Sequence, residues 1–130
     1  MPTPQKSPDI EIYVQSTDTS AVQAWLGQRF PQKTPLAWRP AGKRQWRSKL
    51  DHDGHVIPVL VIEEASHGFI SVWLDSPHTP WADDKECARE AFTALGCPVR
   101  ATAGSWHEGD DPDLWWEVNQ TGEHELHWPG

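Results

Sequence analysis

Residues 55–74, HVIPVLVIEEASHGFISVWL, contain the longest apolar run of the chain and decide its class of fold. The segment His55–Glu63 is apolar on both faces of an extended strand, which predicts a central strand covered on both sides. A second strand is expected at Phe69–Leu74. The apolar run Val56–Ile62 is strand-sized and far shorter than the about 20 residues that cross a bilayer, so we expect no membrane-spanning segment.

The residues before this region predict a strand, a helix and two more short strands. Apolar and polar residues alternate from Ile10 to Gln15, which is typical of a half-buried strand. Asp18 or Thr19 can cap a helix that runs to about Phe30, because Pro31 stops it. Two short strands are expected next, at residues 35–39 and 44–50.

The residues after this region predict the same succession of elements again. Thr79 is expected to cap a helix with Pro80 at its first position, acidic residues in its first turn and Gly96 at its end. Three strands follow, at residues 98–103, 114–118 and 124–128. The predicted units are a flexible tail at residues 1–8 and one domain at residues 9–130, with halves at about 9–65 and 68–130.

These elements predict an α+β fold with a mixed or antiparallel sheet and two helices. The β-α-β-β-β order occurs twice, so we interpret the two halves as a pseudo-repeat of the element pattern. A single ferredoxin-like sheet with both helices on one face explains the same elements.

In element order and length alone, the chain resembles the glyoxalase/bleomycin-resistance proteins. Metalloenzymes of that class take a His or Glu ligand from the first and last strand of each module. The resemblance implies Glu11, Glu63 or Glu64, and Glu125 or His127 as the ligands. The strand expected at Phe69–Leu74 contains neither residue type, so one ligand is missing and no metal site is predicted.

The charge of the chain is unevenly distributed. The formal net charge is −8 and the pI is about 5.2, which argues against nucleic acid as the partner. From Arg29 to Lys49 every charged residue is basic, and from Ala101 to the end every charged residue is acidic. We expect the two blocks to face each other in the fold or to be solvated, to form a partner surface, or to pair between the subunits of a homodimer.

Only two cysteines occur, Cys87 and Cys97, and their spacing fits neither a zinc site nor a CxxC motif. A helix around Cys87 would separate them by roughly 15 Å, which is beyond the reach of a disulfide. We therefore expect reduced cysteines and a cytoplasmic protein.

The histidines and carboxylates suggest no clear catalytic or metal centre. Asp51, His52, Asp53 and His55 share one predicted turn, but a closed site needs about four convergent ligands. His124 and His127 lie on one strand at a spacing that directs them to opposite faces. The sequence contains no nucleophile motif and no glycine-rich phosphate loop. We expect no cofactor, and an enzyme is not the favoured interpretation.

Nine tryptophans in 130 residues are the most unusual feature. Trp25, Trp46 and Trp73 can be assigned to apolar faces. Trp115 and Trp116 are neighbours on one strand and must face opposite sides of the sheet. The six tryptophans other than Trp25, Trp46 and Trp73 are harder to bury together, and they form either a second, smaller core or a binding surface: Trp38, Trp81, Trp106, Trp115, Trp116 and Trp128.

The favoured hypothesis is a small acidic protein-interaction or regulatory module. In this hypothesis a basic partner is steered by carboxylates and held by tryptophan anchors. A small-molecule binder or metalloenzyme with a cleft between two modules is the alternative, with Glu63, His124 and Glu125 as candidates. A third hypothesis, single-stranded nucleic acid stacked on Trp38 and Trp46, conflicts with the net charge. The predicted partner-binding residues are Trp106, Asp110, Asp111, Asp113, Trp115 and Trp116.

Overall fold

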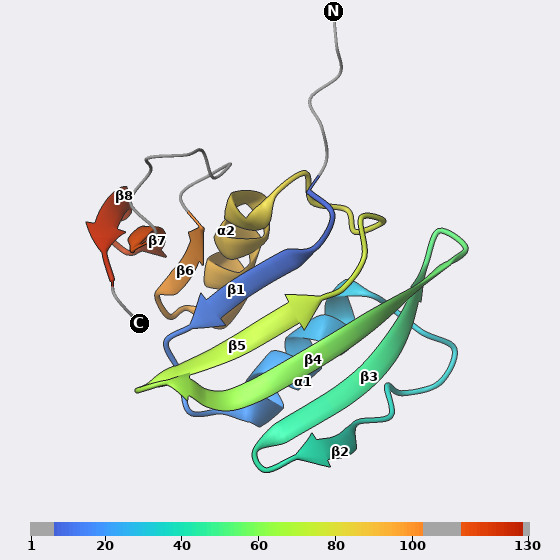
Figure 1. Cartoon of the computed structure of the whole chain (residues 1–130). Helices are drawn as coiled ribbons and strands as arrows, with labels where there is room; N and C mark the ends of the chain where they lie inside the picture. Colours follow the sequence, from blue (N-terminus) through green and yellow to red (C-terminus); the bar gives the residue numbers. More distant parts are fainter. Residues whose placement is uncertain (1–6, 103–112, 129–130) are drawn as a thin grey trace, which may run out of the picture.

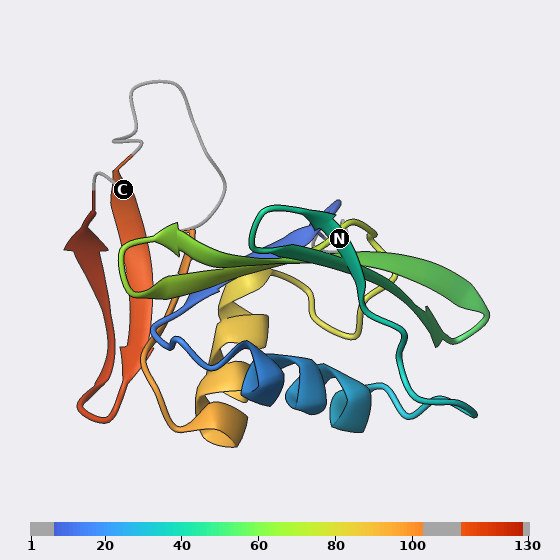
Figure 2. The same ribbon diagram turned by 90° about the horizontal axis from the view of Figure 1, so that it is seen from below.

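The computed structural model describes residues 7–102 and 113–128, which form a mixed α+β fold with one open sheet (Figures 1 and 2). Every neighbouring pair of strands is antiparallel, and the order across the sheet is β2-β3-β4-β5-β1-β6-β7-β8. In chain order the elements are β1 (Ile10–Val14), α1 (Thr19–Arg29), β2 (Arg39–Gly42), β3 (Gln45–His52), β4 (His55–Ser66), β5 (Phe69–Leu74), α2 (Asp84–Leu95), β6 (Val99–Thr102), β7 (Leu114–Asn119) and β8 (Gly122–His127).

Both helices cover the same face of the sheet, and within residues 7–102 and 113–128 no helix lies on the other face (Figure 2). β1 and β4 each pair antiparallel with β5, so they run parallel to each other, and α1 lies in the connection between them. β5 and β6 each pair antiparallel with β1, so they also run parallel to each other, and α2 connects them. The β7–β8 hairpin turns steeply away from the plane of β2–β5, as the accumulated twist of a wide sheet requires (Figure 2). We call the uncovered side the open face.

The core lies between the sheet and the two helices. Every second residue of a strand points to the same side of the sheet. The register partners Ile12 and Val72 point to the helix side, where both are completely buried. The small side chains of Ala88 and Ala91, both fully buried, allow α2 to lie close to the sheet. The helix α1 contributes Val22, Trp25 and Leu26 to the same cluster.

The start of α2 differs from the sequence expectation. The N-cap is Asp83, whose carboxylate accepts a hydrogen bond from the Glu86 N–H, and not Thr79. Residues 76–82 form a loop because Trp81 is drawn into the core, where only 3% of it is exposed. The predicted end is confirmed: Gly96 adopts φ 72°, and its N–H bonds to the Phe92 carbonyl.

Two strand predictions are also corrected. The strand expected at residues 35–39 begins only at Arg39, because Leu36 and Trp38 instead pack against the core outside the sheet. β4 is an inner strand as predicted, but only one of its faces is covered. Its helix-side residues are buried, whereas Val56 on the open face is 57% exposed and Leu60 is half-buried.

Most of the predicted flexible tail lies outside the described residues, but the Ser7 N–H donates to the Ala82 carbonyl at 3.0 Å. Cys87 is buried, Cys97 is half-buried, and both are free thiols. Burial raises the pKa of the Cys87 thiol well above its usual range. Among the described residues, neither helix has the length and apolar character needed to cross a membrane.

Candidate functional site

The open face carries an aromatic cluster, which we define as Tyr13, Phe69, Trp115 and Trp128. Tyr13 stands on the opposite side of β1 from its buried neighbours, and Trp115 occupies the equivalent side of β7. The rings of Tyr13, Trp115 and Trp128 meet pairwise edge-to-face, with centroids 5.0–5.4 Å apart. Phe69 lies 4.9 Å from Trp128 and is buried, whereas the other three rings are half-buried.

An ion pair lies beside this cluster. The Arg100 guanidinium lies 4.6 Å from the ring centroids of both Phe69 and Trp128, which is cation–π geometry. Its Nε donates to Glu117 Oε1 at 2.9 Å, and the two side chains are only 17% and 12% exposed. Asn119 Nδ2 also donates to Glu117, at 2.7 Å. Arg100 therefore joins the rings to the β6–β7 ladder.

The pKa values of this region follow from these contacts. Burial by itself raises the pKa of Glu117, but the hydrogen bonds from Arg100 and Asn119 and the Arg100 charge outweigh it and lower the pKa below its usual value. Burial and the nearby Glu11 carboxylate raise the pKa of Tyr13 to about 12. The phenol of Tyr13 is therefore protonated at neutral pH and suits hydrogen bonding and packing better than base catalysis.

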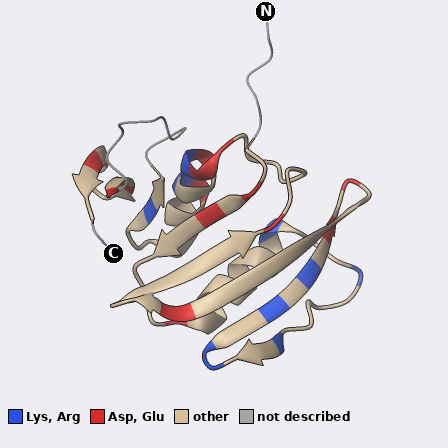
Figure 3. Cartoon of the chain, in the orientation of Figure 1, with Lys and Arg blue, Asp and Glu red and all other residues tan. Residues whose placement is uncertain are grey.

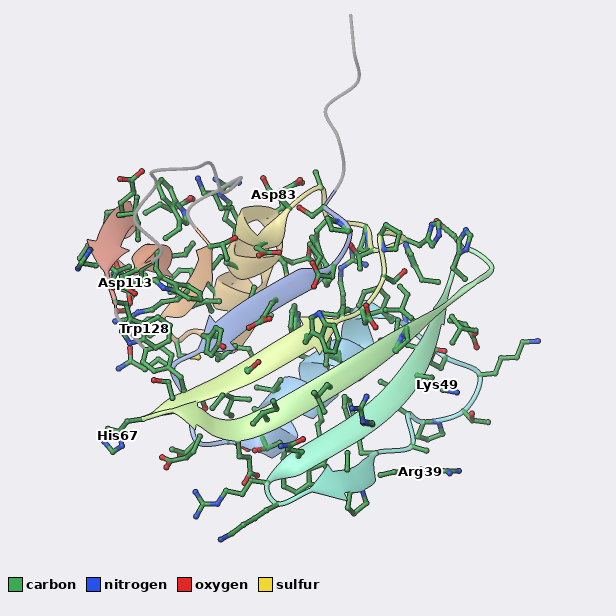
Figure 4. All side chains as sticks on the ribbon, in the orientation of Figure 1. Arg39, Lys49, His67, Asp83, Asp113 and Trp128 are labelled. Carbon is green, nitrogen blue, oxygen red and sulfur yellow. The ribbon has the colours of Figure 1, made fainter. Side chains whose placement is uncertain are left out.

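The predicted partner-binding residues are only partly brought together. Asp113 and Trp115 lie at the aromatic cluster, where the backbone N–H of Trp128 donates to the backbone carbonyl of Asp113 at 2.7 Å (Figure 4). Trp116 lies on the opposite face of β7, as its position next to Trp115 requires. Trp106, Asp110 and Asp111 lie outside the described residues, and their role stays a prediction.

Trp116 is held by charged side chains on the helix side of the sheet. The Lys85 ammonium lies 4.2 Å from the centroid of its ring. Its indole Nε1–H donates to Glu123 Oε1 at 3.0 Å, and Glu123 also accepts from Arg89 at 2.8 Å. Trp115 and Trp116 therefore cannot both anchor one flat partner surface.

The described strand residues of the basic and acidic blocks lie at opposite edges of the sheet (Figure 3). Arg39, Arg47 and Lys49 belong to β2 and β3 at one edge, whereas the carboxylates of Glu123 and Glu125 belong to β8 at the other. For the described residues of these strands, the expectation that the two blocks face each other within the fold is therefore wrong, whereas Glu108, Asp110 and Asp111 lie outside the described residues. β8 is next to β7 in the sheet, but Glu123 and Glu125 lie on the Trp116 side of the β7–β8 ladder, whereas Trp115 lies on the open face.

The candidates for a metal site or a two-module cleft do not converge. Within the described residues, no group of three or more His, Cys, Asp or Glu side chains is placed to hold a metal ion. Glu63 accepts a hydrogen bond from Thr19 at 2.6 Å on β4, and four strands separate it from His124 and Glu125 on β8. In the predicted turn, the His55 ring stacks on His78 with centroids 3.6 Å apart.

The proposed nucleic-acid surface is also divided between the two faces. Trp46 is the register partner of Val61, a buried residue on the helix side of β4. Arg47 and Lys49 alternate with it and point to the open face. The stacking rings and the cations therefore do not share one surface.

Sequence analysis missed Tyr13, Phe69 and Arg100 as members of the site. Tyr13 alternates with the apolar residues of its strand and so shares a side with Glu11 and Gln15, and an aromatic residue on that side is the signal that could have identified a second apolar surface. For Arg100 no local pattern exists, because its partners come from β5, β7 and the residue after β8.

Asp84, the first residue of α2, gives a testable pH dependence. Burial raises the pKa of Asp84 to about 6, and the charges of Asp9 and Glu11 act in the same direction, against hydrogen bonds from Thr102 and the Glu11 N–H. The folded protein therefore binds this proton more tightly than the unfolded chain, so stability falls as pH rises from about 4 to about 6. We expect Asp84→Asn to remove this slope and to stabilise the protein at pH 7.5 by about 1–2 kcal/mol.

Urea unfolding at several pH values between about 4 and about 8 checks this expectation. Asp83→Asn is the matched control, because asparagine caps a helix as well as aspartate does, and it should keep the wild-type slope. Equal slopes in wild type and Asp84→Asn would contradict the assignment.

Comparison with known proteins adds no assignment, because no family model, no curated protein and no solved structure matches this chain.

Proposed function

We propose that this protein is an interaction module that binds a protein partner at the C-terminal end of its open face. The observation that carries the proposal is the aromatic cluster, in which Tyr13, Trp115 and Trp128 are half-buried on the open face of the sheet. Exposed tryptophan and tyrosine are the residues most often found at interface hot spots, because they bury much area at a small entropic cost.

The chemistry of the surroundings favours a basic partner. Asp113, Glu117, Glu123 and Glu125 are the described charged residues of the C-terminal region, and residues 101–130 contain neither Lys nor Arg. Glu117 and Glu123 are already paired with arginines of the chain, whereas Glu125 on β8 is exposed at the edge of the sheet, on the side of Trp116. The negative charge of this region accelerates association with a basic partner through long-range attraction, which does not require the carboxylates to lie on the contact face, and the aromatic residues slow its dissociation.

For the architecture, we propose the ferredoxin-like interpretation for the inner strands β4-β5-β1-β6 with α1 and α2. Both helix connections join parallel strands that have one strand between them, which supports it. The first strands of the two halves, β1 and β5, pair at the centre of the sheet. The strand next to β5 is β4, the last strand of the first half, whereas the strand next to β1 is β6, which directly follows the helix of the second half. This difference favours the ferredoxin-like interpretation over a symmetric pseudo-repeat. The two free thiols favour a reducing compartment such as the cytoplasm.

Trp128→Ala and Trp116→Ala form a matched pair that tests the proposed function. We expect native mass spectrometry of tagged wild-type protein from its own host to show a stoichiometric second polypeptide. Trp128→Ala should reduce its capture at least about tenfold, because it removes a ring of the aromatic cluster. Trp116→Ala should retain the partner, since Trp116 lies on the other face.

A bare chain from the wild type, or equal losses in both folded variants, would contradict the proposal. A second copy of this chain as the captured polypeptide would make the protein a homodimer through the same surface.

A further inference from the structure

A second candidate site lies at the opposite end of the open face. A groove of about 630 Å³ is lined by β2, β3 and β4 and by the segment that enters β2. Its volume lies in the range of small-molecule sites. The charged lining residues are Arg39, Arg47 and Lys49, and the apolar ones include Ala37 and Pro58.

The groove forms where the β2–β3 ladder opens. Arg39 and Arg47 are register partners, and the ladder does not extend beyond them toward Ala37 and Lys49. Further along the same edge of β3, the Gln32 side chain accepts from the Asp51 N–H and donates to its carbonyl, at 3.0 and 3.1 Å. Backbone groups alternate in direction along a strand, so the N–H and C=O of Lys49 point to the same edge as those of Asp51. The backbone edge of β3 at Lys49, which β2 does not cover, therefore faces the groove.

The cations of the groove lack the partners that other arginines of the chain have. Four of the six arginines form ion pairs, Arg29 with Glu90, Arg44 with Glu64, Arg89 with Glu123 and Arg100 with Glu117. Arg39 and Arg47 form no ion pair within the described part of the chain, although acidic residues outnumber basic ones in the sequence by 19 to 11. Like charges directly opposite on neighbouring strands destabilise a sheet.

We propose that this groove binds a small anion with at least two grouped negative charges, such as a phosphate ester or a polycarboxylate. The ligand places its anionic oxygens between Arg39 and Arg47, whose planar guanidinium groups suit bidentate contacts. Lys49 adds a third positive charge, and Ala37 and Pro58 contact the apolar part of the ligand. Binding relieves the repulsion between the two arginines. This site does not depend on the partner surface at the aromatic cluster.

Thermal unfolding in inorganic pyrophosphate and in citrate tests the proposal, with sodium chloride keeping the ionic strength constant. We expect one of these anions to raise the Tm of the wild type by about 2–5 °C. Pyrophosphate alone would identify the phosphate class, and citrate alone the carboxylate class. Arg47→Gln should abolish the shift, and Lys33→Gln, an exposed residue of the same basic block outside the groove, should retain it.

Backbone amide shifts in nuclear magnetic resonance spectra locate the bound anion. We expect the largest changes at Arg39, Arg47 and Lys49. The absence of any Tm shift with either anion, a shift that survives Arg47→Gln, or amide changes elsewhere would overturn the proposal. Tighter binding of an oligothymidylate than of both small anions would overturn the small-ligand assignment.

Discussion

Replacing Trp81 with alanine is expected to lower the free energy of unfolding by about 3–5 kcal/mol. Trp81 is only 3% exposed, stacks on Trp25 with centroids 6.1 Å apart and meets the Phe30 ring edge-on at 5.6 Å. Its indole Nε1–H donates to Glu90 Oε2 at 2.6 Å, and Glu90 also pairs with Arg29. The substitution removes a large buried ring and one partner of a half-buried carboxylate, so both losses add.

Two further variants separate these losses. Trp81→Phe keeps most of the apolar contact but removes the hydrogen bond, and should cost about 1–2 kcal/mol. Trp38→Ala removes a half-buried ring at the margin of the core and should cost less than Trp81→Ala. Urea unfolding followed by far-ultraviolet circular dichroism measures all three. A smaller loss for Trp81→Ala than for Trp38→Ala would contradict the assignment of Trp81 to the core.

Replacing Arg100 with methionine is expected to cost about 2–4 kcal/mol. The change leaves the Glu117 carboxylate, only 12% exposed, without its principal partner. It also removes the cation between the rings of Phe69 and Trp128. Because the carboxylate has lost this partner, the pKa of Glu117 should rise in the variant.

The pH dependence and a double variant test this explanation. The lowered pKa of Glu117 means that its pair with Arg100 stabilises the wild type above about pH 4 and is lost as pH falls through the folded pKa. The difference between wild type and Arg100→Met should therefore shrink in acid. Arg100→Met/Glu117→Met should recover much of the lost stability, since no buried charge is left unpaired. If the double variant recovers no stability, the loss in Arg100→Met comes mainly from the missing contact of Arg100 with the Phe69 and Trp128 rings and not from the unpaired Glu117 carboxylate.

The elements that local pattern alone determines were predicted from the sequence. The bounds of β5, Phe69–Leu74, are the predicted ones, because a run of apolar residues is bounded by Gly68 and Asp75. The N-terminal helix begins after Asp18, which is one of the two cap candidates, Asp18 and Thr19, that the sequence offered. In both places, the residues that decide the structure are close neighbours in sequence.

The errors concern residues whose environment comes from distant segments. Trp81 is buried by Trp25 on α1 and by Glu90 on α2, and no pattern around residue 81 carries that information. The apolar residues on both sides of β4 predicted two covered faces, but both helices in the described part of the chain lie on one side, and Val56 on the open face is exposed. Within the candidate site, the opposite orientations of Trp115 and Trp116 followed from strand geometry, whereas the contact of Trp115 with Tyr13 required the strand order.

Hydroxyl-radical footprinting of the protein, alone and bound to its captured partner, tests most directly whether the C-terminal end of the open face is the partner surface. The proposal predicts that Tyr13, Trp115 and Trp128 are oxidised less in the complex. Trp116, on the opposite face of the same strand as Trp115, serves as the internal control and should be oxidised equally in both samples. Protection of Trp116 with unchanged oxidation of Trp115 and Trp128 would contradict the proposal and place the partner on the helix side of the sheet.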